Sequence, residues 1–248
     1  MALAAYALPR SRHCVMCGHR ISRFLPYRGG LDDVPKLMRE LDVVGSDVEN
    51  FTCPRCGAHD RERHLLMYMQ ATGLLSSVRG QDVLHFAPEA RLSEWIAARN
   101  PSRYIKCDLY PQSPDLVCVD ILAIPLAAES FDLVIANHVL EHVDDDLQAL
   151  AEIRRVLKIG GHAILQTPYS RKLRHTWQDP GIADDQSRLQ AYGQEDHVRL
   201  YGRDIFERFV STGLVSRVRQ HADLLPDADV GKVGVNPAEP FFLFQRMQ

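Results

Sequence analysis

The sequence of 248 residues lacks several features that would each define a class of protein. No apolar run approaches the ~20 residues that a bilayer-spanning helix needs. Basic residues are not in surplus, because the formal net charge is −3, and this argues against a surface built for nucleic acid or for an anionic membrane. No internal repeat or low-complexity tract is present. We therefore expect a globular protein without a membrane partner.

Cysteines are few, and the opening of the chain is not basic. Residues 1–12 contain a short apolar run without a basic residue ahead of it, so they fit a secretory signal poorly. Four of the six cysteines fall in two CxxC pairs, which suits metal binding in a reducing compartment better than a disulfide framework. We expect the other two, Cys107 and Cys118, to be small buried residues of strands. The expected location is the cytoplasm.

The paired cysteines predict a zinc site. Cys14 and Cys17 form the first pair, Cys53 and Cys56 form the second, and a glycine follows each pair and lets the backbone turn toward the sulfurs. Four thiolates suit tetrahedral Zn²⁺, and such a closed site is structural because no ligand position is left for water. Vicinal disulfide or redox pairs, or four unrelated cysteines, are the alternatives.

The segment between the two cysteine pairs has apolar residues at helical spacing. Val34, Leu37, Leu41 and Val44 recur at helical spacing and predict a helix between the two cysteine pairs. We assign residues 1–60 to a zinc-ribbon-like module, 61–80 to a linking helix and 81–248 to the main domain.

Three basic residues follow the second cysteine pair closely. Arg61, Arg63 and His64 open the linking helix. They could contact an acidic ligand, or they could form the solvated start of a helix, and the sequence favours the second interpretation.

The stretch from residue 131 to residue 161 is typical of the middle of an α/β domain. An apolar run over residues 131–136 ends abruptly in Asn137 and His138, as a central parallel strand does where its carboxyl end meets a ligand crevice. Three aspartates, residues 144–146, then cap a helix with apolar residues at helical spacing. Gly160 and Gly161 are expected to end this helix, and residues 162–168 to form the next strand.

This order of motifs resembles a known family. A strand, the turn HVLEHVDDD, a helix ending in RVLKIGG and a strand ending in Thr-Pro are similar to class I S-adenosylmethionine-dependent methyltransferases of the type 11 group. The resemblance covers residues 81–248. It implies an α/β fold with a Rossmann-like seven-stranded methyltransferase sheet, beside the small N-terminal zinc-binding module, and S-adenosyl-L-methionine as the cofactor. We expect residues 214–225 and 241–245 to be its last two strands and residues 202–212 a helix.

The first strand of this domain lacks the glycine-rich turn that usually follows it. His85, Ala87 and Glu89 occupy the corresponding positions. A carboxylate there would repel the pyrophosphate of a dinucleotide but is compatible with the ammonium and sulfonium of S-adenosylmethionine. Alternatively, Glu89 is a helix-start glutamate favoured by the helix dipole.

A second acid closes the next expected strand, residues 104–107. Asp108 lies nineteen residues beyond Glu89, which is the position of an acid that accepts the hydrogens of a ribose diol. By resemblance, Asp120 takes the adenine amino group. The same resemblance adds four neighbours to the cofactor site: Leu109, Ile121, Asn137 and His138.

Histidines are the natural candidates for chemistry, because their pKa lies near neutrality. In ubiquinone-pathway O-methyltransferases and small-RNA 2′-O-methyltransferases, a Glu-x-x-Glu-His turn and a downstream histidine hold a divalent metal. Glu141, His142 and His197 resemble three of those four ligands, whereas His138 stands in place of the first glutamate. Without a metal, His142 or His197 would act as a general base or orient the substrate, with Glu141 beside them. The third alternative is that the turn only caps its helix.

The sequence predicts a methyltransferase that acts on oxygen of a small molecule or saccharide. Residues 169–193, which are polar, are expected to cover the acceptor site by analogy with the fold. A zinc-containing RNA methyltransferase is an alternative, but the acidic main domain and the absence of a base-flipping motif argue against it. A cofactor-binding scaffold without turnover is the third hypothesis.

Overall fold

A seven-stranded sheet forms the centre of the molecule. The computed structural model describes residues 11–248, and the opening stretch that we judged a poor secretory signal lies almost wholly outside them. The strand order is β10-β11-β8-β7-β4-β5-β6, and β11 runs antiparallel to both of its neighbours. The strands are β4 (Asp82–Phe86), β5 (Arg103–Asp108), β6 (Val117–Cys118), β7 (Phe131–Ala136), β8 (Leu157–Ile164), β10 (Leu214–Ser216) and β11 (Leu243–Arg246). This topology confirms the Rossmann-like methyltransferase sheet.

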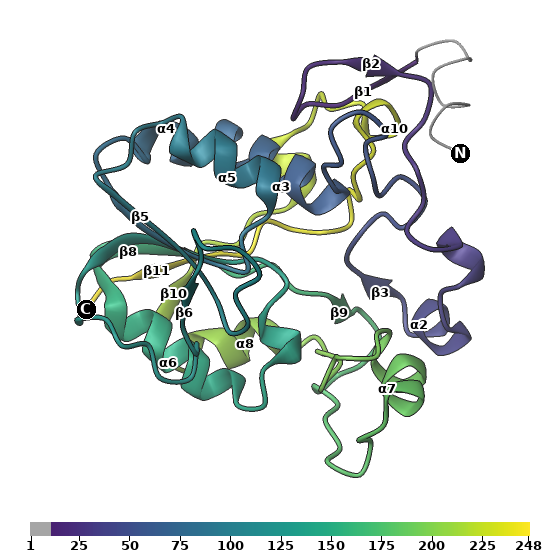
Figure 1. Ribbon diagram of the computed structural model, residues 1–248. Coiled ribbons are helices and arrows are strands. Elements are labelled where there is room, and N and C mark those ends of the chain that lie inside the picture. Colours follow the sequence, from purple (N-terminus) through teal and green to yellow (C-terminus); the bar gives the residue numbers. More distant parts are fainter. Residues whose placement is uncertain (1–10) are drawn as a thin grey trace.

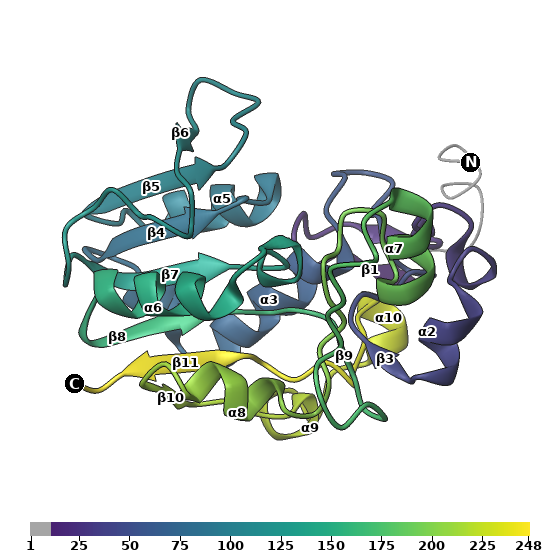
Figure 2. The ribbon, with the colours of Figure 1, turned by 90° about the horizontal axis from the view of Figure 1, so that it is seen from below.

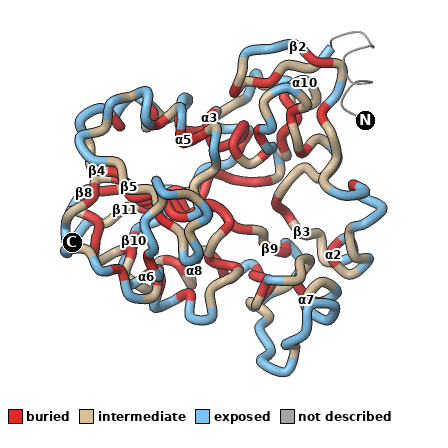
Figure 3. Tube along the Cα trace, in the orientation of Figure 1, coloured by how far each residue is buried: buried red, intermediate tan, exposed pale blue. Residues whose placement is uncertain are grey.

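Helices cover both faces of the sheet (Figures 1 and 2). One face carries α3 (Asp60–Ala71), α4 (Leu74–Ser77) and α5 (Ala90–Ala97), and the other carries α6 (Asp146–Val156) and α8 (Ile205–Val210). Side chains of β7 alternate between the two layers, as the period of a strand requires. Leu133 and Ile135 pack in the cluster with α3 and α5, whereas Val134 and Ala136 pack in the cluster with α6 and α8. The buried core therefore follows the sheet (Figure 3).

The helix after β7 is shorter than the sequence predicted. Helix α6 ends at Val156 and β8 begins at Leu157, so Gly160 and Gly161 lie inside a strand and do not end the helix. The pairing of β7 with β8 is irregular here. A Cβ on Gly161 would lie 2.9–3.1 Å from three backbone carbonyl oxygens. Glycine is required by this close approach of two strands.

The C-terminal strands pair as an antiparallel hairpin, as predicted, but their extent differs. Strand β10 covers only Leu214–Ser216, because the chain then turns into α9 (His221–Leu224) and α10 (Val230–Val233). Helix α8 is shorter than the predicted 202–212. The prediction for Cys118 was wrong, since this residue is exposed on the edge strand β6, whereas Cys107 is buried. Within residues 11–248, no helix has the length and apolarity to cross a bilayer.

The N-terminal part lies beside the carboxyl ends of the parallel strands. It contains β1 (Arg12–His13), β2 (Arg20–Ile21), η1 (Gly30–Asp32), α2 (Lys36–Glu40) and β3 (Val43–Val44). The helix predicted over residues 34–44 is shorter in the structure, where only α2 is helical. Val44 belongs instead to β3, which pairs with β9 (Tyr169–Ser170). Helix α2 also packs on α7 (Asp185–Tyr192) through Met38 and Tyr192. The segment between the cysteine pairs and the segment after β8 therefore lie side by side (Figures 1 and 2).

The interpretation of the basic cluster as a solvated helix start was wrong for two of its three members. Arg63 and His64 are 0% and 2% exposed. The guanidinium of Arg63 donates five hydrogen bonds to backbone carbonyls, namely those of Asn50, Phe51, Ala58, Val233 and Gly234. A buried cation needs such partners because it has lost its water. Arg63 thereby joins the module to the C-terminal segment.

Replacing Arg63 should strongly destabilise the protein. Arg63→Met removes a donor from five backbone carbonyls, of which, within residues 11–248, only that of Ala58 keeps another donor, the N–H of Cys53, so we expect the free energy of unfolding to fall by about 3 kcal/mol or more. Denaturant unfolding measures the change, and Arg79→Met, at an exposed arginine, is the control, with an expected change within about 0.5 kcal/mol. Equal stability of the two variants would contradict the role of Arg63.

Candidate active site

Four neighbouring parallel strands bring the predicted cofactor residues to one edge of the sheet. In the order β7-β4-β5-β6, the strands are followed or closed by Asn137, Glu89, Asp108 and Asp120 respectively. Carboxyl ends of parallel strands meet at the same edge, which is where ligands bind in open α/β sheets. The structure thus places these side chains at the edge where the sequence predicted a cofactor.

Glu89 does not cap the helix that it precedes. Its carboxylate makes no hydrogen bond to the first turn of α5 and instead accepts one from the Asn137 amide. Its other oxygen lies 3.3 Å from Nε2 of His85, whose Nδ1 lies 2.9 Å from the hydroxyl of Tyr104. Burial disfavours the charge of Glu89, but His85 and Asn137 hold the pKa of its carboxyl below the usual value. Glu89 is therefore a fixed anion, and its contact with the fully buried side chain of His85 helps to hold it in place.

The missing glycine turn is accommodated by an unusual backbone. Ala87 has a φ of +43°, in the left-handed region that a glycine would favour. Its N–H donates to the carbonyl of Cys107 at 2.8 Å, which ties the turn to β5. The geometry of the glycine turn is therefore present without the glycine.

Asp108 and Asp120, the two acids predicted to bind adenosine, each accept a hydrogen bond from a backbone N–H two residues later. Asp108 accepts the N–H of Tyr110 through Oδ1, and Asp120 accepts the N–H of Leu122 through Oδ1, both at 2.8 Å. Each interaction uses one carboxylate oxygen and fixes the side chain at the edge. Their predicted neighbours differ, because Leu109 is 48% exposed while Ile121 is 6% exposed and packs into the core.

Glu141 is the centre of the histidine-bearing turn. It lies in η2 (Leu140–His142), where Oε1 is 3.1 Å from Nδ1 of His138 and Oε2 accepts the hydroxyl hydrogen of Thr167 at 2.8 Å. Burial opposes its ionisation, but His138 holds the pKa of the carboxyl well below its usual range. Glu141 is therefore an anion that orients its neighbours.

His138 lies between two buried carboxylates. Besides Glu141, Oε1 of Glu239 is 3.7 Å from its Nε2. Burial and Arg61 act against the charged form of the imidazole, but the two carboxylates prevail and raise the pKa of His138. The two carboxylates thus hold the imidazole of His138 from both nitrogens and favour its charged form. The sequence analysis missed Glu239, which lies in a distant loop with no pattern that marks it.

The two remaining histidines have opposite properties. Nδ1 of His197 lies 3.0 Å from the carbonyl of Tyr192, and its Nε2 is buried without a hydrogen-bond partner. Burial lowers the pKa of His197 to about 4. His142 is partly exposed, and although burial acts against its charge, Asp196, at 3.2 Å, raises its pKa. His197 is therefore neutral at pH 7 and offers its unpaired Nε2 as an acceptor.

Glu141, His142 and His197 converge closely enough to hold a metal ion. Their ligand atoms all lie within 4.8 Å of one another. One carboxylate and two imidazoles form a common donor set for Zn²⁺ and similar divalent ions. His138, which takes the place of a fourth ligand in the resemblance, is instead bound to Glu141 and Glu239.

A cavity of about 370 Å³ adjoins this turn. His138, Pro168 and His197 form its inner side. Most of its outer wall comes from the segment between the cysteine pairs: Tyr27, Arg28, Gly30, Leu31, Asp33, Val34, Pro35, Met38, Arg39, Asp42, Val43, Gly45, Ser46, Val48 and Phe51. The predicted cover, residues 169–193, contributes Leu189, Tyr192 and Gly193. The sequence analysis missed the larger part of this wall, although the apolar spacing of residues 34–44 was a signal of it.

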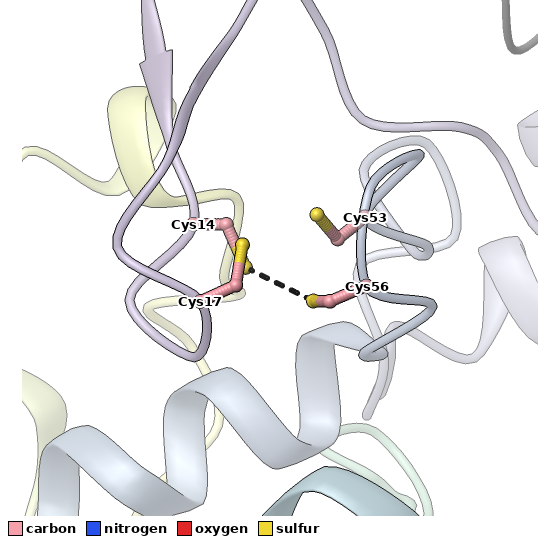
Figure 4. Close-up of side chains that lie close together, drawn as sticks. All are labelled: Cys14, Cys17, Cys53 and Cys56. Carbon is pink, nitrogen blue, oxygen red and sulfur yellow. Dashed lines mark hydrogen bonds between the residues drawn. The ribbon is translucent and has the colours of Figure 1, made fainter.

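The four paired cysteines converge at the other end of the module. Figure 4 shows the two pairs facing each other from separate loops. Their sulfurs all lie within 4.8 Å of one another, and those of Cys14 and Cys56 are 3.8 Å apart. A zinc tetrahedron with metal–sulfur bonds of about 2.3 Å has edges of about 3.8 Å. The donor set and the spacing therefore fit Zn²⁺.

The cysteine loops are attached to the cofactor side of the main domain. Arg91 donates to the carbonyl of Cys56 at 2.9 Å, and Trp95 donates to that of Met16 at 3.1 Å. Both side chains belong to α5, the helix that follows Glu89. The module is therefore anchored beside the first turn of the cofactor edge.

Comparisons with known proteins find similarity over part of the chain. Residues 77–165 match the family model described as "Methyltransferase domain". An uncharacterised 37.1 kDa protein in transposon TN4556 of Streptomyces fradiae is 32% identical over 123 residues, which are 50% of this chain and 31% of that protein. A malonyl-[acyl-carrier protein] O-methyltransferase of Halorhodospira halophila is 31% identical over 108 residues, 42% of this chain and 33% of that protein. The matches thus span about a third of these relatives' own length.

Solved structures include more distant likenesses. An S-adenosylmethionine-dependent methyltransferase from Mesorhizobium loti is 14% identical with a TM-score of 0.47, covering 71% of this chain and 96% of that one. The 1,6-didemethyltoxoflavin-N1-methyltransferase of Burkholderia thailandensis is 13% identical with a TM-score of 0.48, and the match covers 73% of this chain and 79% of that one.

The segment from residue 77 to residue 165 is thus similar to the methyltransferase domain family. It contains strands β4 to β7, most of β8 and the histidine-bearing turn. The predicted family and the presence of a four-cysteine cluster are confirmed.

The neutral state of His197 predicts a pH dependence of stability. An unfolded histidine has a pKa of about 6.5, whereas His197 in the folded chain has a pKa of about 4. The unfolded state therefore takes up the proton first, and the free energy of unfolding should fall by up to about 3 kcal/mol as the pH drops from about 6.5 to 4. Above pH 6.5 this contribution is constant.

Denaturant unfolding of His197→Asn from pH 4.5 to 7.5 tests this contribution. The asparagine amide can still donate to the Tyr192 carbonyl but does not titrate, so the pH dependence should become shallower than in the unchanged protein. His175→Asn, at a histidine whose side chain is 73% exposed, is the control. An unchanged dependence in His197→Asn would show that His197 is not the responsible group.

Proposed function

We propose that the protein is an S-adenosylmethionine-dependent methyltransferase that methylates an oxygen atom of a small-molecule or saccharide acceptor bound in the cavity. One observation carries the proposal. The inner side of the cavity is formed by His138 and His197, and His138 directly follows Asn137, whose amide is bonded to Glu89 at the cofactor edge. Acceptor and cofactor sites therefore meet at one turn.

The acids at the strand ends suit the cofactor. Asp108 is placed to accept hydrogen bonds from a ribose diol, and Asp120 from an adenine amino group. Glu89 provides the fixed negative charge that an ammonium group or a sulfonium requires. In this assignment the methionine end of the cofactor lies toward Glu89 and the reacting sulfur toward the turn at His138.

The cavity supports a small acceptor. Its volume of about 370 Å³ is near the lower end of the range of about 300–1,000 Å³ for small-molecule sites. The net charge of −3 gives no support to an RNA acceptor. A relative's printed name, malonyl-[acyl-carrier protein] O-methyltransferase, agrees with oxygen as the acceptor atom.

His197 is suited to receive the acceptor's proton. When bound, S-adenosylmethionine supplies an electrophilic methyl group, so the chain has mainly to align the acceptor with it. His197 lines the cavity, its Nε2 is buried without a hydrogen-bond partner, and its imidazole is neutral at pH 7. It can accept the hydroxyl proton as oxygen bonds to carbon. Alternatively, a divalent ion held by Glu141, His142 and His197 would acidify the hydroxyl.

Binding of the demethylated cofactor tests this proposal. S-adenosylhomocysteine should bind the purified chain in a calorimetric titration. Asp108→Asn should weaken binding by about tenfold, because a hydrogen bond to a charged group contributes about 1.5–3 kcal/mol. Asp227→Asn, at an exposed aspartate far along the chain, is the matched control. If S-adenosylhomocysteine does not bind the unchanged protein, the methyltransferase proposal fails.

We also propose that the four cysteines hold one structural Zn²⁺. Their convergence and the sulfur spacing support it, and the described cysteines are all free thiols. Reduced thiols of this kind fit a reducing compartment and thus a cytoplasmic location. The ion would fix the two loops that α5 holds through Arg91 and Trp95.

Metal analysis of the purified protein should find one zinc per chain. Cys53→Ser should lose the zinc and lower the melting temperature, since a three-thiolate site binds more weakly and the ion stabilises the fold. The control is Cys118→Ser, at a cysteine exposed outside the cluster, which should keep both. Equal zinc content in the two variants would refute the assignment, and a second bound ion would point to Glu141, His142 and His197.

A further inference from the structure

The cavity contains a cation that the rest of the site does not use. Arg61, the first basic residue of α3, lines the cavity between the module and the histidine turn. Its Nε donates to the hydroxyl of Ser46 at 2.7 Å, and its guanidinium carbon lies 5.7 Å from the centre of the Phe51 ring. Ser46 and Phe51 are themselves part of the lining. The guanidinium is therefore held at the cavity wall.

Other charged groups of the lining already have partners. Arg28 forms a bidentate pair with Glu195, at 2.7 and 3.0 Å. Asp42 forms one with Arg171, at 2.9 and 3.0 Å. These pairs are internally neutral, so they leave little charge for a ligand.

Arg61 has no acidic partner in the described part of the chain, and only its Nε has a hydrogen-bond partner there. Arg39, at the exposed mouth, donates only to the carbonyl of Leu31 at 3.4 Å. Asp33 is also at this mouth and accepts the N–H of Gly29. Deeper in the cavity, His138 is already paired with the carboxylates of Glu141 and Glu239. Among the described residues of the inner lining, Arg61 is therefore the cation that is left for a ligand.

We propose that the cavity binds an acceptor that carries an anionic oxyacid group, a carboxylate or a phosphate, and that Arg61 holds this group. A guanidinium with two free nitrogens matches two oxygens of such a group in a bidentate arrangement. The aromatic rings of Tyr27, Phe51 and Tyr192 line the same cavity and suit an apolar body attached to the anion. This inference rests on the proposed function only in that it calls the ligand a methyl acceptor. Binding of the anionic ligand itself requires no turnover.

Arg61 would also set the orientation of the acceptor. The cation lies on the wall supplied by α3 and the module, whereas His197 lies on the inner side beside the turn. An acceptor anchored by its anionic end at Arg61 would direct its other end toward His197 and the cofactor edge. The module would then determine which molecules are methylated.

Calorimetry with matched probes tests the inference. Phenylacetate and phenyl phosphate carry the anionic group on an aromatic ring, and phenylacetamide is the neutral analogue of the first. Each is titrated into the full zinc-containing chain at constant ionic strength, with and without S-adenosylhomocysteine. We expect at least one anion to bind about tenfold or more tightly than phenylacetamide. The comparison of phenylacetate with phenyl phosphate tells a carboxylate site from a phosphate site.

Variants assign the preference to Arg61. Arg61→Met should abolish the difference between anion and amide, Arg61→Lys should restore part of it, and Arg23→Met, at an exposed arginine of the module outside the cavity, should leave it unchanged. Melting temperatures show whether each variant is folded. The inference is overturned if no anion binds, if phenylacetamide binds as tightly, or if the preference persists in Arg61→Met. Failure to bind S-adenosylhomocysteine would instead refute the proposed function and leave the anion site standing.

Discussion

The arrangement of the whole molecule depends on how one buried cation is satisfied. The guanidinium of Arg63 is fully buried and forms no ion pair with an acid among residues 11–248, so it is held by carbonyl oxygens from three separate segments. Two of these segments flank the second cysteine pair, and the third lies near the C-terminus. Because carbonyls have fixed directions, the segments can meet only in one arrangement. That arrangement places the module against the carboxyl edge of the sheet and so creates the outer wall of the cavity.

Local backbone strain is concentrated at the same edge. Ala87 and His138 both have positive φ, +43° and +55°, at the ends of the adjacent strands β4 and β7. Residues other than glycine adopt this conformation at a cost of order 1 kcal/mol, and only where neighbours impose it. Here the N–H of Ala87 is bound by Cys107 and that of His138 by Gln166. Strain of this kind is common where side chains must be aimed at a ligand.

The sequence predicted the features that depend on residues close together in the chain. The apolar run of β7 and its abrupt polar end identified the crevice edge, because both features depend on residues adjacent in the chain. The Asp145 cap of α6 was predictable for the same reason. The two CxxC pairs also predicted the four-cysteine cluster through their spacing.

Contacts between distant segments could not be predicted in this way. The spacer between the cysteine pairs forms only the short helix α2, because Val43 and Val44 pair with residues more than a hundred positions later. Glu239 reaches His138 from a loop with no periodic pattern. Arg63 looked solvated because its carbonyl partners carry no side-chain signal. In each case the information lies in tertiary register, which local patterns do not contain.

The distance along the chain between Arg63 and two of its partners, Val233 and Gly234, has a consequence for biosynthesis. While the polypeptide emerges from the ribosome, its N-terminal part is complete long before these two carbonyls exist. Until then the guanidinium must remain hydrated, and the module cannot take its final place. Docking of the module is therefore delayed until residues 233 and 234 have been translated, and the cavity whose outer wall the module supplies can form only after that.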